Sequence, residues 1–172
     1  MEPEKRFFEF RAELPESGPA RIEGALMPYG GKARAMKLGT TFTEEFRAGS
    51  IKSGLDNAIA NIMHDRMKPV ARTGAGLVLT DGEKELRASI ELPDTVHGRE
   101  ARELVRDGIL RGFSIEFRAM DQEWQGSHRI ITEAHVFGLA LVDRPAYSGA
   151  QIEARLKELY GHYPASKIRY YY

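Results

Sequence analysis

The 172-residue chain contains no cysteine, which excludes disulfide bonds, a cysteine nucleophile and thiolate zinc sites. Its 25 basic and 25 acidic side chains give a net charge of zero, so the composition does not indicate a general nucleic-acid binder. No apolar run approaches the ~20 residues that a membrane-crossing helix needs, and no apolar signal core follows the charged residues 1–6. We therefore expect an intracellular, soluble protein without a nucleic-acid or membrane partner.

Two patterns that could indicate a cofactor are incomplete. Gly31 and Lys32 resemble part of a phosphate-binding loop, but Leu26 stands where that loop requires its first glycine. The histidines form no i, i+4 pair with a flanking acid, which is the pattern of a helical zinc site. They are His64, His97, His128, His135 and His162. We therefore predict no metal site and no cofactor.

The sequence shows no internal repeat and no low-complexity linker, and its length suits one sizeable core. We predict a single domain over residues 1–162 and a poorly ordered tail over residues 163–172. Strand patterns outnumber helix patterns. They predict a small, antiparallel-rich sheet that is closed or nearly closed, with two or three helices packed outside it.

Periodicity and turn signals place the expected elements. Strands are expected at residues 5–12, 21–27, 58–63, 77–80, 85–91, 113–118 and 128–143. Helices are expected at residues 44–48, 95–107 and 148–160, the second ended by Gly108. Asp81 and Gly82 predict a hairpin turn, and the three glycines of residues 28–41 predict a mobile loop.

The most informative run is residues 112–118 (GFSIEFR). Its aromatic and branched residues alternate with Ser114, Glu116 and Arg118, which is the pattern of a half-buried strand. The strand would hold Ser114 on a rigid support on its polar face, where a substrate could reach it. A serine held in this way can be a nucleophile if a histidine lies opposite it. An ordinary surface serine fits the same alternation.

His64 follows the apolar Ile62 and Met63 at the end of an expected strand, and Asp65 follows it. A histidine can take the serine proton near neutral pH because its ordinary pKa lies close to the working pH. A histidine beside an aspartate is equally compatible with a surface turn.

Five segments in this order and spacing are informative together: residues 21–24 (RIEG), 61–65 (NIMHD), 90–94 (IELPD), 103–118 (ELVRDGILRGFSIEFR) and 129–147 (RIITEAHVFGLALVDRPAY). They resemble the prohead proteases of tailed bacteriophages, which are serine proteases related in fold to the herpesvirus assembly protease. The resemblance covers most of residues 5–155. It implies a herpesvirus-protease-like β-barrel wrapped by helices, with Ser114 as nucleophile and His64 as its base.

The resemblance leaves the third catalytic residue open. The herpesvirus enzymes use a second histidine on the strand after the nucleophile strand, and His135 and Glu133 share one face of that expected strand. Many phage relatives carry a glutamate where this chain has Gly138. His135 is the first candidate and Glu133 the second, with Asp143 as a further alternative. A solvated strand-edge charge also explains Glu133.

An oxyanion hole of backbone N–H groups is also expected. The resemblance places Arg144 in the loop that supplies it, directly or through water. A surface arginine in a turn is the alternative reading of that residue.

The implied function is a serine endopeptidase of capsid maturation that works through an acyl-enzyme. Its expected partners are the scaffold or the delta segment of the major capsid protein, the protease itself, and a second copy in a homodimer. It would act inside the prohead, in the host cytoplasm. A catalytically inactive assembly factor and a β-barrel binding module remain the alternatives.

Overall fold

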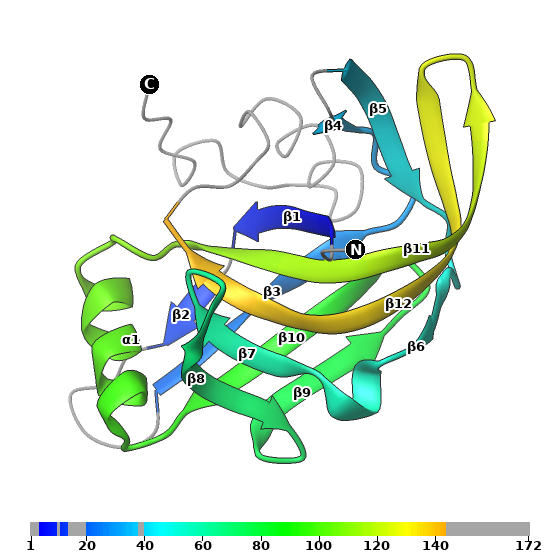
Figure 1. The fold of residues 1–172 in the computed structure, drawn as a ribbon. Coiled ribbons are helices and arrows are strands. Elements are labelled where there is room, and N and C mark those ends of the chain that lie inside the picture. Colours follow the sequence, from blue (N-terminus) through cyan, green and yellow to red (C-terminus); the bar gives the residue numbers. More distant parts are fainter. Residues whose placement is uncertain (1–3, 10, 14–19, 38–39, 144–172) are drawn as a thin grey trace.

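The computed structural model describes residues 4–9, 11–13, 20–37 and 40–143 (Figure 1). In these residues, twelve strands form one sheet, accompanied by one α-helix and one 3₁₀ helix. The elements are β1 (Glu4–Glu9), β2 (Arg11–Glu13), β3 (Ala20–Pro28), β4 (Ala33–Lys37), β5 (Thr40–Phe46), β6 (Ile51–Ser53), η1 (Leu55–Asn57), β7 (Ile59–Ile62), β8 (Asp65–Thr73), β9 (Gly76–Asp81), β10 (Glu85–Leu92), α1 (Val96–Arg106), β11 (Gly112–Gln125) and β12 (His128–Val142). Within the described ranges, no helix has the length and apolarity needed to span a membrane.

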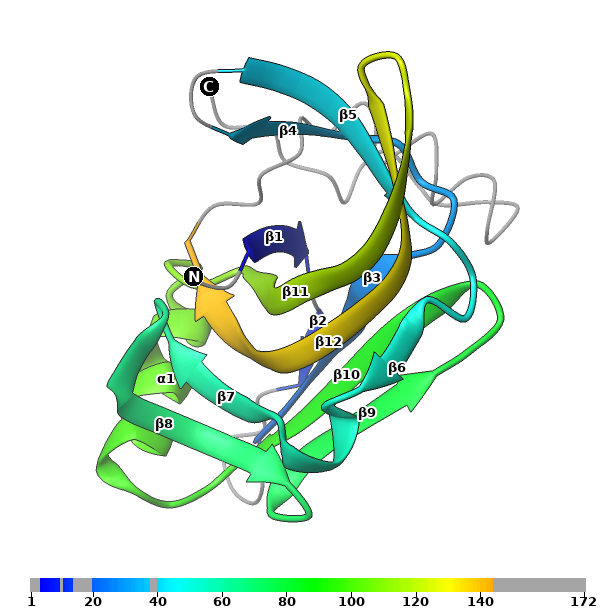
Figure 2. The same ribbon diagram turned by 45° about the vertical axis from the view of Figure 1, so that its right-hand side comes forward.

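The hydrogen-bonded path through the sheet runs β1-β11-β12-β7-β8-β9-β10-β3-β2. On the edge of β12 that faces away from β11, the strands β5, β6 and β7 follow one another, each parallel to β12. Figures 1 and 2 show β11 and β12 as long bent strands around which the sheet curls, with α1 at one end. The expected curled, mostly β fold is confirmed, and the described strands form a half-barrel instead of a closed barrel.

The core lies on one face of β11. Phe113, Ile115 and Phe117 are fully buried there, and the ring of Phe117 packs edge-on against Phe46 of β5 at a centroid distance of 4.8 Å. Successive residues of a strand point to opposite faces. The anchoring of these three side chains therefore fixes Ser114 and Glu116 on the other face.

Several expected elements are confirmed. β9 and β10 pair as an antiparallel hairpin beside Asp81, and β7 and β12 begin and end close to the expected bounds. β11 begins as expected at Gly112 but extends to Gln125, well beyond the expected end at residue 118. α1 spans residues 96–106, the side chain of Thr95 caps its first turn by accepting from the Gly98 N–H, and Gly108 follows with a φ of 71°.

Two local predictions are wrong. Residues 28–41 are not a loop throughout, because β4 and the start of β5 lie within them. Residues 44–48 are not a helix, because β5 extends to Phe46 and pairs with β4 and β12. Phe42, Glu44 and Phe46 are all buried, which is a period of two. The Thr43 capping signal is local, and pairing with neighbouring strands overrides it.

The described residues contain one α-helix, whereas two or three were expected. The helix expected at residues 148–160 and the tail at residues 163–172 lie outside the described residues.

Candidate active site

Ser114 lies on β11 between two neighbouring strands. Its register partners are Phe7 on β1 and Ala140 on β12. The sequence predicts a serine within reach of a substrate, but the residue is 0% exposed in this structure. One reason is that the imidazole of His64 lies directly against its hydroxyl.

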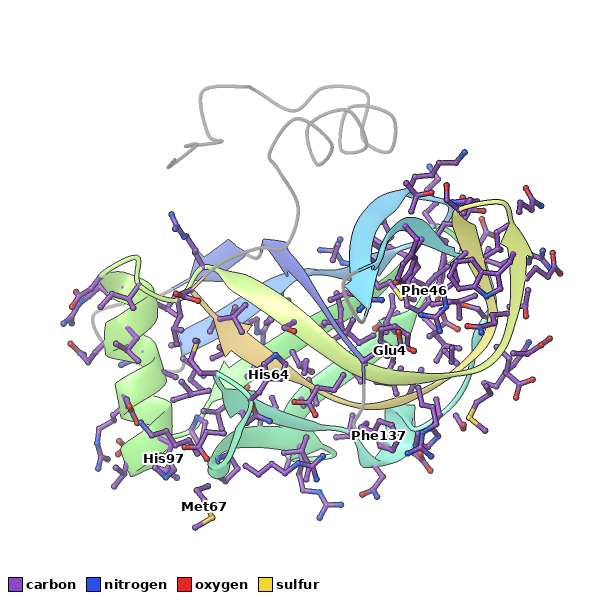
Figure 3. The ribbon with its side chains drawn as sticks, turned by 45° about the horizontal axis from the view of Figure 1, so that its top comes forward. Glu4, Phe46, His64, Met67, His97 and Phe137 are labelled. Atoms are coloured by element: carbon purple, nitrogen blue, oxygen red, sulfur yellow. The ribbon has the colours of Figure 1, made fainter. Side chains whose placement is uncertain are left out.

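His64 lies in the two-residue turn that joins β7 to β8, where Ile62 pairs with Asp65. Both central residues of the turn have positive φ, 53° for Met63 and 61° for His64. This is the signature of a type I′ turn, which normally carries Asn or Gly. The Met63 N–H donates to the Leu141 carbonyl on β12 at 2.9 Å, so the turn is fixed to the strand beside β11. Figure 3 shows His64 where the β7–β8 hairpin faces β11 and β12.

Both ring nitrogens of His64 make short contacts. Nε2 lies 2.8 Å from Ser114 Oγ, and Nδ1 lies 2.5 Å from Glu116 Oε1. An ionised carboxylate can only accept, so Nδ1 carries the proton and donates it to Glu116. In the neutral imidazole, Nε2 is then the acceptor, and the Ser114 hydroxyl donates to it.

Glu116 is the site residue that the sequence analysis missed as a catalytic candidate. It is 4% exposed and lies two residues after Ser114 on the same face of β11. Alternate strand residues are about 7 Å apart, a gap that one imidazole and its two hydrogen bonds can span. The alternation of residues 113–118 already places Glu116 on the same face as Ser114. The candidates that the sequence analysis gives for the third catalytic residue lie on the next expected strand instead.

Arg66 brings a positive charge close to Glu116. Its Nη2 lies 3.7 Å from Glu116 Oε2, and its side chain is 74% exposed. Glu116 therefore faces the His64 ring with one oxygen and a solvent-exposed guanidinium with the other. A pair at this distance with a mostly exposed arginine contributes little to stability.

The structure does not bring His135 or Glu133 to His64. His135 pairs with Arg118, four residues along β11 from Ser114, and its Nδ1 lies 2.7 Å from Ser53 Oγ. Glu133 is exposed and lies opposite Asp121. Both lie toward the bend of β12, more than about 10 Å along the strand from the residue that pairs with Ser114.

Gly138 explains why β12 has no acidic side chain at this level. It is the register partner of Glu116 on one side and of Ile59 on the other. A Cβ at this position would lie 2.2 Å from the Ile59 carbonyl oxygen. β7 and β12 therefore approach too closely for any side chain at position 138. The carboxylate in contact with His64 comes instead from Glu116, the residue of β11 that pairs with Gly138.

Asp143 ends the described part of the chain, and its carbonyl accepts from Arg111 Nε at 2.9 Å. Arg144, the expected oxyanion support, lies outside the described residues.

An ion pair holds the hairpin of His64 against α1. Lys68 Nζ of β8 donates to Glu100 Oε1 of α1 at 2.7 Å. The hydrogen bond from Lys68 is the main reason that the pKa of Glu100 lies below its ordinary value, and His97 acts in the same direction. Glu100 is thus ionised at neutral pH and keeps this contact.

Taken together, the site is a hydroxyl, an imidazole and a carboxylate joined by two hydrogen bonds. The carboxylate fixes the tautomer in which the imidazole can accept the hydroxyl proton, and it stabilises the imidazolium that results. This arrangement is suited to nucleophilic attack by the serine oxygen on a carbonyl carbon.

A family model described as Caudovirus prohead serine protease matches residues 8–163. No curated protein sequence matches the chain significantly. Among solved structures, the capsid assembly protease gp21 of bacteriophage T4 is similar in fold. The two share 11% sequence identity and a TM-score of 0.51, over 81% of this chain and 98% of that protein.

Proposed function

Because the chain belongs to the family of caudovirus prohead serine proteases, we propose that it is a serine endopeptidase of capsid maturation with Ser114 as its nucleophile. The observation that carries the proposal is the hydrogen-bonded series from Ser114 through His64 to Glu116. These three side chains come from the nucleophile strand and a turn fixed beside it, and they have the order of a serine protease triad.

In the proposed reaction, Ser114 Oγ attacks the peptide carbonyl carbon while His64 Nε2 takes the hydroxyl proton. Glu116 stabilises the imidazolium through Nδ1. Collapse of the tetrahedral intermediate breaks the C–N bond, and His64 gives its proton to the departing amine. Water then attacks the acyl-enzyme with His64 as base, which releases the acid product and restores Ser114.

The proposed substrates are the scaffold or the delta segment of the major capsid protein, together with the protease itself. The resemblance in fold to a protein described as a capsid assembly protease supports this choice. The reaction would take place inside the assembling prohead. Since Ser114 is fully buried in this structure, a peptide can reach it only after neighbouring groups move, and assembly or dimer formation could supply that change.

The test is co-expression of this protein with the capsid protein of the same phage, wild type against Ser114→Ala, with intact masses as the readout. We expect a shortened capsid protein with the wild type and the full-length mass with the variant. Cleavage that persists with Ser114→Ala would contradict the assignment of the nucleophile. Equal, uncleaved masses with both would favour the alternative of an inactive assembly factor.

A further inference from the structure

We propose that the side-chain amide of Asn61 on β7 binds the backbone of the peptide substrate beside the scissile bond. The inference rests on the proposed peptidase function, and it adds a binding residue on a strand that the triad itself does not use.

Asn61 is placed on the face of the sheet that carries the triad. Across the strands, Ser114 pairs with Ala140, and Ala140 pairs with Asn61. Laterally paired residues of a sheet point to the same face, so Ser114 and Asn61 flank the small side chain of Ala140. Two strand spacings separate their backbones, which is about 10 Å.

The side-chain oxygen of Asn61 lacks a hydrogen-bond partner among the residues that the structure describes. The residue is 4% exposed, and its Oδ1 is shielded from solvent. A buried acceptor left unsatisfied costs free energy, and native proteins keep few of them. A peptide N–H docked at this position would supply the missing donor.

Positioning of the catalytic histidine does not explain Asn61. The two ring nitrogens of His64 already contact Ser114 and Glu116, so the amide has no ring nitrogen to orient. The pairing of β7 with β8 shifts register on both sides of Asn61. Such irregularities re-aim side chains and are frequent next to active sites.

The spacing also indicates which part of a substrate would be bound. An extended peptide advances about 3.3 Å per residue. A chain that crosses the strands from Ser114 toward β7 therefore places a peptide group two to three residues from the attacked carbonyl next to Asn61. The expected ligand is an extended peptide several residues long, recognised through its backbone.

The test compares Asn61→Leu, which keeps the branched shape of the side chain but removes its polar atoms, with the wild type. Three quantities are measured: the thermal midpoint, labelling of Ser114 by a small alkyl fluorophosphonate, and cleavage of a synthetic peptide that spans the site mapped in the co-expression experiment. Ser50→Ala is the matched control. Its Oγ is also buried without a partner, and it lies beside Ala134, about 20 Å along β12 from Ala140.

We expect Asn61→Leu to keep or raise the thermal midpoint and to slow peptide cleavage about 5- to 100-fold. The loss should exceed any loss of labelling by the small probe, which has no peptide group to place at Asn61. Ser50→Ala should cleave at the wild-type rate.

Equal losses for peptide and probe, or a loss that follows a lowered thermal midpoint, would show that Asn61 is structural and overturn the inference. So would unchanged cleavage in Asn61→Leu. Absence of labelling and of cleavage in the wild type would overturn the proposed function, and this inference with it.

Discussion

At the residue scale, Glu116 determines which ring nitrogen of His64 carries the proton. The carboxylate accepts from Nδ1 at 2.5 Å, which leaves Nε2 free to accept from Ser114. In Glu116→Gln, the amide can donate to Nδ1, and the imidazole then takes the tautomer that cannot accept the serine proton. We expect labelling of Ser114 by a fluorophosphonate to slow roughly 10³- to 10⁴-fold, with an unchanged thermal midpoint within a few degrees.

Glu133→Gln is the control for this change, because it removes the same charge from the exposed part of β12. It should label at nearly the wild-type rate. If Glu133→Gln loses labelling of Ser114 and Glu116→Gln keeps it, Glu116 is not the carboxylate that supports His64, although the structure places the two in contact.

The sequence was sufficient to single out two of the three residues of the proposed triad. Alternation along residues 113–118 placed Ser114 on a polar face, and the resemblance assigned His64 as the base. Glu116 was not predicted because its role depends on where the β7–β8 turn carries the imidazole. That position is set by the pairing of β7 with β12, a contact between segments about 80 residues apart in the chain.

At the scale of elements, the turn that presents His64 is strained. Met63 has a φ of 53° and a side chain that is 49% exposed. A bulky residue is rare at such φ, whereas Asn is several-fold enriched there. Met63→Asn should therefore stabilise the fold by up to about 1 kcal/mol, or about 2–4 °C in thermal midpoint for a chain of this size.

Thermal denaturation of Met63→Asn checks this prediction. Met120→Asn is the control, because Met120 is an exposed methionine inside β11, where Asn is unfavourable. Its midpoint should stay the same or fall. A midpoint of Met63→Asn at or below that of the wild type would mean that the turn is not strained at this residue.

The contact between β7 and β12 is equally specific. In Gly138→Ala, the added Cβ would lie 2.2 Å from the Ile59 carbonyl oxygen, so one strand must move away from the other. We expect a loss of about 1–3 kcal/mol in unfolding free energy and weaker Ser114 labelling, because β7 carries the turn of His64.

Gly82→Ala is the comparison for this change, measured by chemical denaturation. Its Cβ would lie 3.3 Å from the Glu85 carbonyl oxygen in the turn before β10, which a small adjustment accommodates. Equal losses in the two variants would show that the close approach at Gly138 is not specific.

Elements with strong local signals were predictable, and elements defined by their partners were not. α1 has a capping residue at Thr95 and a terminating glycine at Gly108, both visible in the sequence. β5 has a local helix signal at Thr43, yet its buried side chains pack toward the core and its backbone pairs with β12. The half-barrel curl likewise depends on long-range pairing.

At the scale of the whole molecule, a buried ion network joins the N-terminal strand to the sheet. Glu44 of β5 accepts from Arg6 of β1 at 2.6 and 2.8 Å and from Arg129 of β12 at 2.7 Å. Arg129 also donates to Glu4 of β1 at 2.5 and 2.9 Å. Figure 3 labels Glu4 of β1.

Arg129 stays charged in this setting. Burial by itself would lower the pKa of its guanidinium, but the hydrogen bond to Glu4 and the negative charges of Glu44 and Glu4 outweigh burial and raise the pKa. The guanidinium of Arg129 therefore keeps its positive charge within the network. Because β1 pairs with β11 opposite Ser114, the same charges help to fix the nucleophile strand.

Glu44→Gln tests this coupling. Glu44 is 0% exposed and lies between two arginines, so its neutralisation leaves Arg6 and Arg129 to share the charge of Glu4, at a cost of about 3–5 kcal/mol. The same change in Glu123→Gln removes one side of the exposed pair with Arg47 and should cost less than about 1 kcal/mol. Chemical denaturation measures the unfolding free energy of both variants.

A loss in Glu44→Gln as small as that in Glu123→Gln would mean that β1 is held by its strand pairing alone. A large loss with faster amide exchange in β1 and β11 would show that the buried charges hold the N-terminal strand against the strand of Ser114.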